Sequence, residues 1–288
     1  MGALAYLDVK KFKALKDTRI MVHFKVRTRV TVPQMLKEIG DTNIKHSSVE
    51  KSRNLEKDIP IYFVLDENND GALITTANEI VVQSCQDMFY MCTNMLTADL
   101  RGLRDISTDM SNMFCCCEKL QYVIFPVKFG RRVKSTCQMF HSCKRLGAIN
   151  LPPHFGEQAF NMMAMFYGCT SLESIRLPKG FGKTAVFIND MFNDCSTLRA
   201  VTLNDNFGVR ATFVPGLFEG CKNLKALTLN KGFNCKYFVD ATNMLNTGGG
   251  KIELNASQKF LDMLEANEEM DAKIFGTTEC LIPAFTEN

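Results

Sequence analysis

The stretch MFYGCTSLESIRLPKGFG, residues 165–182, decides the fold, because most of the chain consists of variations on it. Further copies, degenerate at both ends of the series, start at Met88, Met113, Met139, Met191, Leu217 and Met244. The complete copies start 26 residues apart. Self-similarity at a fixed period in this range is the signature of a solenoid. We therefore expect function on a repeated surface and not in one group of catalytic residues.

The spacing inside one copy predicts how a coil is built. Apolar residues first recur at i, i+3, i+4 and i+7, the stripe of a short helix, at Met162, Met165, Phe166 and Cys169. A strand with alternate residues inward is predicted next, at Leu172, Ile175 and Leu177. Pro178 and the Phe181–Gly182 pair then form a turn, because glycine tolerates the positive φ that starts the next coil.

The repeated motif is M-F-x-x-C-x-x-L-x-x-[IVL]-x-[LF], followed by a turn that ends in Phe-Gly, and it covers residues 88–254. It resembles the BspA-like leucine-rich repeats of bacterial and protist surface proteins and the related mycoplasma-type repeats. The resemblance implies a curved solenoid that binds other macromolecules, often as an adhesin. Many members of this family are exported, whereas we expect no export signal here.

The predicted fold class is α/β: a leucine-rich-repeat solenoid of about six or seven coils, with a parallel sheet on one side and short helices on the other. Residues 1–80 contain no copy and are predicted to form a small α+β domain. Its alternating segment 20–32 predicts a strand, 33–40 a helix, 41–57 a loop, and 59–65 with 72–76 a hairpin. The solenoid spans 81–254, and residues 255–288 form a helical cap that Asn255 or Ser257 begins.

The chain contains twelve cysteines, and six of them stand three residues after the repeat phenylalanine: Cys92, Cys117, Cys143, Cys169, Cys195 and Cys221. A stacked solenoid places these in one inward ladder, which suits free cysteine as a small buried hydrophobe. Disulfides are the alternative reading. The run Cys115–Cys117 lacks the partner pair and the histidines that a zinc site needs, so no metal site is predicted there.

A hairpin turn at residues 66–71 includes the alternate oxygen-bearing residues Asp66, Asn68 and Asp70 before Gly71. They match the first half of a calcium-binding loop, but Ala77 stands where that loop has its bidentate glutamate. A tight turn selects the same residue types. We favour the turn and keep a weak calcium site as the alternative.

Composition indicates an ordered protein, with 46% hydrophobic residues and a net charge of +3 that is too small to imply nucleic acid. We expect no signal peptide and no membrane span, since no apolar run of about 18 residues occurs. With reduced cysteines this favours an intracellular or virion-associated location.

No pattern indicates an enzyme or a cofactor, because phosphate-binding, nucleophile-elbow and zinc-protease motifs are missing from the sequence. His141, two residues before Cys143, is predicted to be a surface residue and not half of a catalytic pair. No catalytic residue is therefore assigned.

Outward positions of the predicted strands vary between copies, and these define a candidate partner-binding face: Tyr122, Ile124, Asn150, Ser174, Arg176, Thr202 and Thr228. Exposed apolar groups and arginine are favoured at such interfaces. A secondary basic patch is formed by Lys128, Arg131, Arg132, Lys134, Lys144 and Arg145. Because few aromatic residues are interleaved with it, nucleic acid is not the expected partner.

The leading hypothesis is a non-enzymatic module that binds a protein through its strand face. The alternative is a structural or receptor-binding component of a virion or surface assembly, which self-associates through residues 1–80. An enzyme within those residues is a third and weaker hypothesis.

Overall fold

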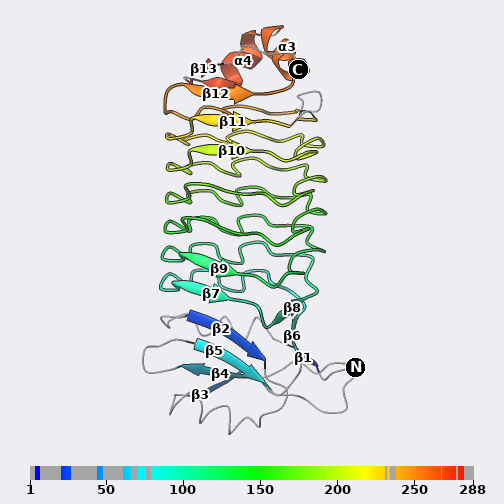
Figure 1. The fold of residues 1–288 in the computed structure, drawn as a ribbon, viewed down its shortest axis with the longest axis vertical. Helices are drawn as coiled ribbons and strands as arrows, with labels where there is room; N and C mark the ends of the chain where they lie inside the picture. Colours follow the sequence, from blue (N-terminus) through cyan, green and yellow to red (C-terminus); the bar gives the residue numbers. More distant parts are fainter. Residues whose placement is uncertain are drawn as a thin grey trace.

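The computed structural model describes residues 4–6, 21–26, 44–47, 61–65, 71–75, 79–230, 232–233, 238–266, 268–276 and 278–281. Over these residues the chain forms a stack of flat coils, with short strands at the amino-terminal end and two helices at the other end (Figure 1). The solenoid predicted from the repeat is therefore confirmed.

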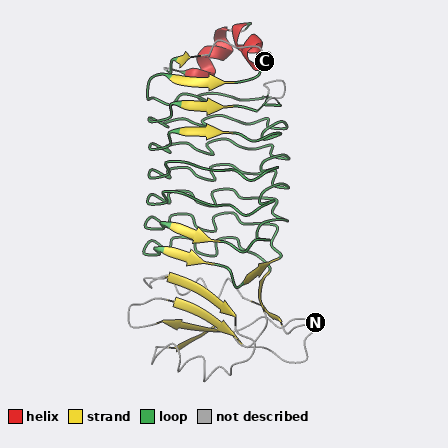
Figure 2. Ribbon diagram, viewed as in Figure 1, coloured by secondary structure: helices red, strands yellow, loops and turns green. Residues whose placement is uncertain are grey.

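The strand side of the stack is a parallel sheet, as predicted. Its strands are β7 (Thr97–Asp99), β9 (Tyr122–Ile124), β10 (Ala200–Thr202), β11 (Ala226–Thr228) and β12 (Ile252–Asn255). Equivalent residues pair in register, with Val201 opposite Leu227 and Leu227 opposite Leu254. In the coils between β9 and β10, single bridges join Asn150 to Arg176 and Ser174 to Ala200, so Figure 2 shows loop there.

The opposite side, which we call the turn side, consists of the Met-Phe segments 88–92, 113–117, 139–143, 165–169, 191–195 and 217–221. Its backbone groups bond the next coil, for example Phe140 N to the Met165 carbonyl at 2.8 Å. Others close turns within the coil, for example Cys169 N to the Phe166 carbonyl at 3.1 Å. Strand side and turn side are thus both held by hydrogen bonds along the stack.

The short helices predicted for the turn side are wrong. Residues 79–230, all of which are described, contain turns and short strands but no helix. Each of these coils has two left-handed residues four apart, one just before its Met-Phe segment and one within it: φ is 52° at Ala164 and 67° at Gly168. A right-handed helix needs negative φ at every residue. A series of turns with this four-residue spacing buries the same i, i+3, i+4, i+7 positions as a helix.

The core is built from columns of identical side chains. One column consists of Phe89, Phe114, Phe140, Phe166, Phe192 and Phe218, whose neighbouring rings are stacked with centroids 5.0 to 5.5 Å apart. A second column fills the corner after the strand, where Phe155, Phe181 and Phe207 stack at 6.4 and 6.1 Å. All these rings are fully buried, so each coil covers the apolar face of the next.

The predicted cysteine ladder is confirmed as an inward column, since all six cysteines are buried. From the second coil on, each thiol donates a hydrogen bond to the phenylalanine carbonyl of the preceding coil. The Sγ–O distance is 3.2 Å from Cys169 to Phe140 and 3.0 Å from Cys221 to Phe192. Burial raises the pKa of the Cys169 thiol to about 12.

The glycine at the corner after the strand is required for a steric reason. Gly182 has φ +69°, and a Cβ there would stand 2.4 Å from the ring of Phe207 in the next coil. Only glycine fits this conformation and this space. The predicted role of the Phe-Gly pair in starting the next coil is therefore confirmed.

The described amino-terminal strands are β1 (Leu4–Tyr6), β2 (Met21–Val26), β3 (Ile44–Ser47), β4 (Ile61–Leu65), β5 (Gly71–Thr75), β6 (Glu79–Val82) and β8 (Leu103–Asp105). Strands β4 and β5 pair antiparallel, as the predicted hairpin requires. β2 pairs in parallel with β7, so these strands continue the solenoid sheet across residue 80. β3 pairs with β4, so the loop prediction was wrong for residues 44–47. The helix predicted at 33–40 lies outside the described residues.

The carboxy-terminal end is covered by α3 (Gln258–Glu265), α4 (Glu268–Phe275) and β13 (Cys280–Leu281). Ser257 caps α3 by accepting a hydrogen bond from Phe260 N, whereas Asn255 belongs to β12. Phe260, Leu261 and Leu264 are buried against the last coil. No helix among the described residues is long and apolar enough to cross a bilayer.

Candidate functional site

The strand face consists of the outward positions of the sheet, and the structure exposes or half-exposes all seven side chains predicted for it. In β9 and β10 the middle residue is buried and its two neighbours point outward. Tyr122 is 48% exposed and Ile124 36%. Arg176 is exposed, and no ion pair is recorded for its side chain among the described residues. Equivalent positions pair between β7 and β9, and they pair or bridge from Asn150 through Arg176 and β10 to β11.

Most of the strand face is small and polar, and its apolar character is concentrated at one end. Two positions before Arg176 in the repeat, the outward column consists of Ala148, Ser174, Ala200 and Ala226. In the preceding coil, Leu96 is 42% exposed and comes immediately before Thr97, the residue of β7 that pairs with Tyr122. The backbone carbonyl of Leu96 accepts from Gln121 N at 2.8 Å, so the two segments are directly adjacent. We call Leu96, Tyr122 and Ile124 the apolar end of the strand face.

The six basic residues predicted as a second patch do not belong to one segment of the coil. Lys128, Arg131, Arg132 and Lys134 follow the strand and its corner, whereas Lys144 and Arg145 precede the next strand. Lys144 pairs with Glu118 at 2.9 Å, and Lys134 donates to the Gln158 amide oxygen at 2.9 Å. The six basic residues are therefore divided between two segments of the coil, and two of them already have side-chain partners.

A third exposed surface was missed from the sequence. It lies between the corner and the turn side, where bridges connect equivalent residues of successive coils. Its exposed apolar side chains are Phe160, Phe187, Phe213 and Val239, which we call the phenylalanine face. The rings of Phe187 and Phe213 stack at 5.5 Å, and Phe187 N donates to the Phe160 carbonyl. Aligning the copies would have revealed it, because Phe187 and Phe213 occupy the same repeat position.

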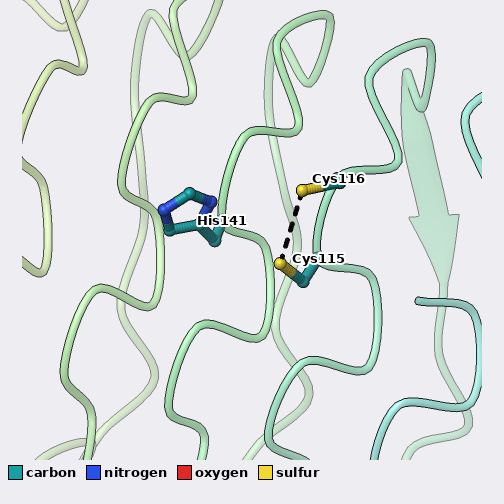
Figure 3. A group of neighbouring side chains, drawn as sticks. All are labelled: Cys115, Cys116 and His141. Atoms are coloured by element: carbon teal, nitrogen blue, oxygen red, sulfur yellow. Dashed lines mark hydrogen bonds between the residues drawn. The ribbon is translucent and has the colours of Figure 1, made fainter. Parts of the chain in front are cut away.

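On the turn side, Cys115, Cys116 and His141 form the one group of three metal-ligating side chains found among the described residues. We call it the Cys-His cluster (Figure 3). Their ligand atoms all lie within 4.8 Å of one another, and the two sulfurs are 3.6 Å apart. No histidine was expected near the cysteine run, and this expectation was wrong. Stacking places His141 beside it, because Cys115 and His141 hold the same position in successive copies.

His141 is half-buried and its ring stacks on Tyr167 with centroids 4.8 Å apart, so the predicted surface position holds only in part. Burial lowers its pKa. Cys143 is fully buried, donates to the Phe114 carbonyl at 3.2 Å, and has its pKa raised well above the usual range by burial. A thiol held in this way is a poor nucleophile. The candidate calcium ligands Asp66, Asn68 and Asp70 lie outside the described residues.

Comparison with known families decides what the repeats are. The model of the BspA type leucine-rich repeat region matches residues 74–164 and 138–241, in six copies. The chain belongs to the BspA-type leucine-rich repeat family. The resemblance drawn from the Met-Phe motif is thereby confirmed, and proteins of this repeat family typically bind other proteins.

This BspA-type chain is also similar to a solved structure, the leucine-rich repeat protein of T. pallidum. The two share 17% sequence identity, and the match covers 75% of this chain and 94% of the other, with a TM-score of 0.32. No curated protein matches the sequence.

Proposed function

We propose that this BspA-type solenoid binds a protein partner through its strand face, with the apolar end as the centre of the contact. The observation that carries the proposal is the exposure of Tyr122 and Ile124 beside Leu96 on an otherwise small and flat surface. Tyrosine supplies a large contact area and a hydroxyl at low cost in conformational entropy, and it is enriched where binding energy concentrates.

The rest of the strand face suits a broad and shallow contact. The alanine, serine and threonine side chains allow a partner to approach the sheet closely, and the ladder behind them keeps the surface rigid. Arg176 stands in the middle of this surface and can pair with a carboxylate of the partner. Binding at a rigid surface loses little conformational entropy, which favours affinity.

The phenylalanine face is the competing surface. Its rings are exposed to a similar degree, but Phe187 and Phe213 already cover each other by stacking, as the phenylalanines of the interior do. Stacking along the column explains them without a partner. We therefore favour the strand face, and matched substitutions on the two surfaces separate them.

The test uses the full chain, immobilised and exposed to an extract of its native source, with captured proteins quantified by mass spectrometry. Changing both Tyr122 and Ile124 to serine is expected to reduce recovery of a specific partner at least about tenfold, since each truncated anchor is worth about 1–2 kcal/mol. Phe187 and Phe213 changed to serine form the matched control and should leave recovery unchanged. Arg176→Glu should weaken binding further and make it more dependent on salt.

Circular dichroism and thermal melting must first show that both double variants are folded. Equal recovery by wild type and by the Tyr122/Ile124 variant would contradict the proposal, and loss only in the Phe187/Phe213 variant would assign binding to the phenylalanine face. Light scattering on the purified chain addresses the alternative assembly role. A self-associated species that the Tyr122/Ile124 substitutions dissociate would identify the partner as a second copy.

A further inference from the structure

The Cys-His cluster combines three side chains that soft metal ions prefer, at separations close to those of a coordination site. A tetrahedral site with zinc–sulfur bonds of about 2.3 Å places two sulfurs about 3.8 Å apart. The sulfurs of Cys115 and Cys116 are 3.6 Å apart without any metal bond. The histidine ligand atom lies within 4.8 Å of both, so a shift of about 1 Å completes the geometry.

Adjacent cysteines can meet in this way only because of the turn-side backbone. In an extended strand, neighbouring side chains point to opposite faces. Cys116 instead has a left-handed backbone with φ of 61°, inside a turn closed by Cys117 N donating to the Phe114 carbonyl at 3.0 Å. Figure 3 shows both sulfurs on the same side, with the imidazole of the next coil beside them.

The imidazole of His141 is held in place, but one of its ring nitrogens has no hydrogen-bond partner. Its ring is fixed by stacking on Tyr167, while Nδ1 is buried and has no hydrogen-bond partner. A buried polar atom without a partner costs about 1–3 kcal/mol. A bound cation would supply the partner, since neutral imidazole donates a nitrogen lone pair to a metal.

We propose that Cys115, Cys116 and His141 bind one thiophilic d10 metal ion, with Zn²⁺ as the first candidate and Cu⁺ as the second. Two thiolates and one imidazole satisfy either ion, and three protein ligands leave one zinc position open to solvent. Binding releases the protons of the two thiols, so affinity rises with pH. Cys115 is buried whereas Cys116 is half-exposed, which provides a route of entry from the surface.

Cys137 provides an internal control. It lies near enough that a charge on it would act on Cys115, and it is half-buried like Cys116, yet it is not part of the group of three. Its thiol should therefore not be a ligand. His154 is the corresponding control for His141, because it is exposed and its Nδ1 bonds Glu157 at 2.8 Å.

The test uses the full chain, stripped of metal and kept reduced under anaerobic conditions. Titration with Co²⁺ as a spectroscopic probe should give a thiolate charge-transfer band that saturates at one equivalent and is displaced by Zn²⁺. Competition with chromophoric chelators then gives the affinities for Zn²⁺ and for Cu⁺. Cys116→Ser and His141→Asn should each weaken binding by more than about 100-fold, beyond the 10–100-fold typical of outer-shell residues. Cys137→Ser and His154→Asn should bind as the wild type does.

Melting curves of the metal-free variants show whether the fold survives, and Cys116 and His141 are only half-buried, so it should. The proposal is overturned if the wild-type chain gives no thiolate band at one equivalent. It is also overturned if Cys116→Ser and His141→Asn, both folded, bind as tightly as Cys137→Ser and His154→Asn.

Discussion

The strand side and the turn side of each coil are built from the same repeat but present side chains in different ways. On the strand side the backbone is extended, so one residue points inward and the next outward, and the outer columns form a flat surface. On the turn side, left-handed residues every four positions break this alternation, and adjacent side chains can share a side, as Cys115 and Cys116 do.

The difference explains why each side suits a different function. A flat surface with one apolar end suits a macromolecule, whereas converging side chains suit a small ligand such as a metal ion. Both sides are held by the same phenylalanine and cysteine columns between them. Substitutions that disturb one side and spare the other therefore test whether the two sides have separate roles.

The largest expected effect comes from the turn-side phenylalanine column. Phe166 is fully buried between the rings of Phe140 and Phe192, at 5.5 Å from each. Phe166→Ala should lower the free energy of unfolding by about 3–5 kcal/mol, because it removes the ring and leaves a cavity. Ile175→Ala, at a half-buried strand-side position, should cost about 1–2 kcal/mol. Urea unfolding measures both, and equal losses would show that the two sides contribute alike.

The corner between the sides gives the next largest effect. Gly182→Ala should cost about 2–3 kcal/mol, because it adds a left-handed alanine whose Cβ meets Phe207 at 2.4 Å. Gly147, at the start of the strand side, has nothing nearer than 3.8 Å to such a Cβ and lacks the positive φ. Gly147→Ala should stay within about 0.5 kcal/mol of wild type. A mild Gly182→Ala in the same unfolding assay would show that the corner can relax.

The first corner differs from the regular ones and predicts a pH dependence. Gly156, Gly182 and Gly208 each bond the corner glycine carbonyl of the preceding coil, whereas Gly130 N bonds the carboxylate of Asp105 at 2.8 Å. Burial raises the pKa of Asp105 to about 6. Between about pH 4 and pH 6 the Asp105 carboxyl is therefore more protonated in the folded state than in the unfolded state. The free energy of unfolding falls as pH rises through this range and stays lower above it.

Asp105→Asn keeps the acceptor for Gly130 but removes the charge. It should raise the free energy of unfolding at pH 7 by about 1–2 kcal/mol, because some solvent reduces the full value of about 1.4 kcal/mol per pKa unit. It should also flatten the stability profile between pH 4 and 6. Asp105→Ala leaves Gly130 N–H unpaired and should be destabilising at pH 7. Thermal melts across this pH range decide, and a profile unchanged by Asp105→Asn would exclude a buried carboxylate as its cause.

The smallest effect concerns the two left-handed positions of one turn. Gly168→Ala should cost about 1 kcal/mol, because its Cβ finds room 3.5 Å from Ser142 and only the backbone conformation is unfavourable. Ala164→Gly relieves the same conformation but removes a buried methyl and loosens the unfolded chain, so it should be within about 0.5 kcal/mol of wild type. Losses of equal size in both would contradict a left-handed backbone at Ala164.

The sequence predicted the coil because its inward positions are constrained by stacking. Phe166, Cys169 and Gly182 recur because every coil must fit the next, so their spacing gave the period, the sheet and the corner. The cap at Ser257 followed from ordinary helix-capping chemistry. The turn side was mistaken for helix because both conformations bury the same spacing. Gly168 and Asp194, at the same left-handed position of successive copies, carried the missing signal, since such residues tolerate positive φ.

The surfaces were harder to predict because they depend on which residues meet between coils. Tyr122 and Arg176 were recognised as outward from alternation alone. His141 was considered only as a partner of Cys143, two residues away in the chain, and not of Cys115, one repeat away. The exposed pair Phe187 and Phe213 escaped notice because phenylalanine also recurs at two interior positions of this repeat.

The hydrogen bonds that join the coils run parallel to the long axis of the stack, and this orientation determines how the molecule responds to tension. A load applied to its two ends would open the bonds of one interface at a time, instead of shearing many together. Each opened coil would release 26 residues, about 90 Å of contour length. Under tension such a chain would therefore lengthen in steps of nearly equal size.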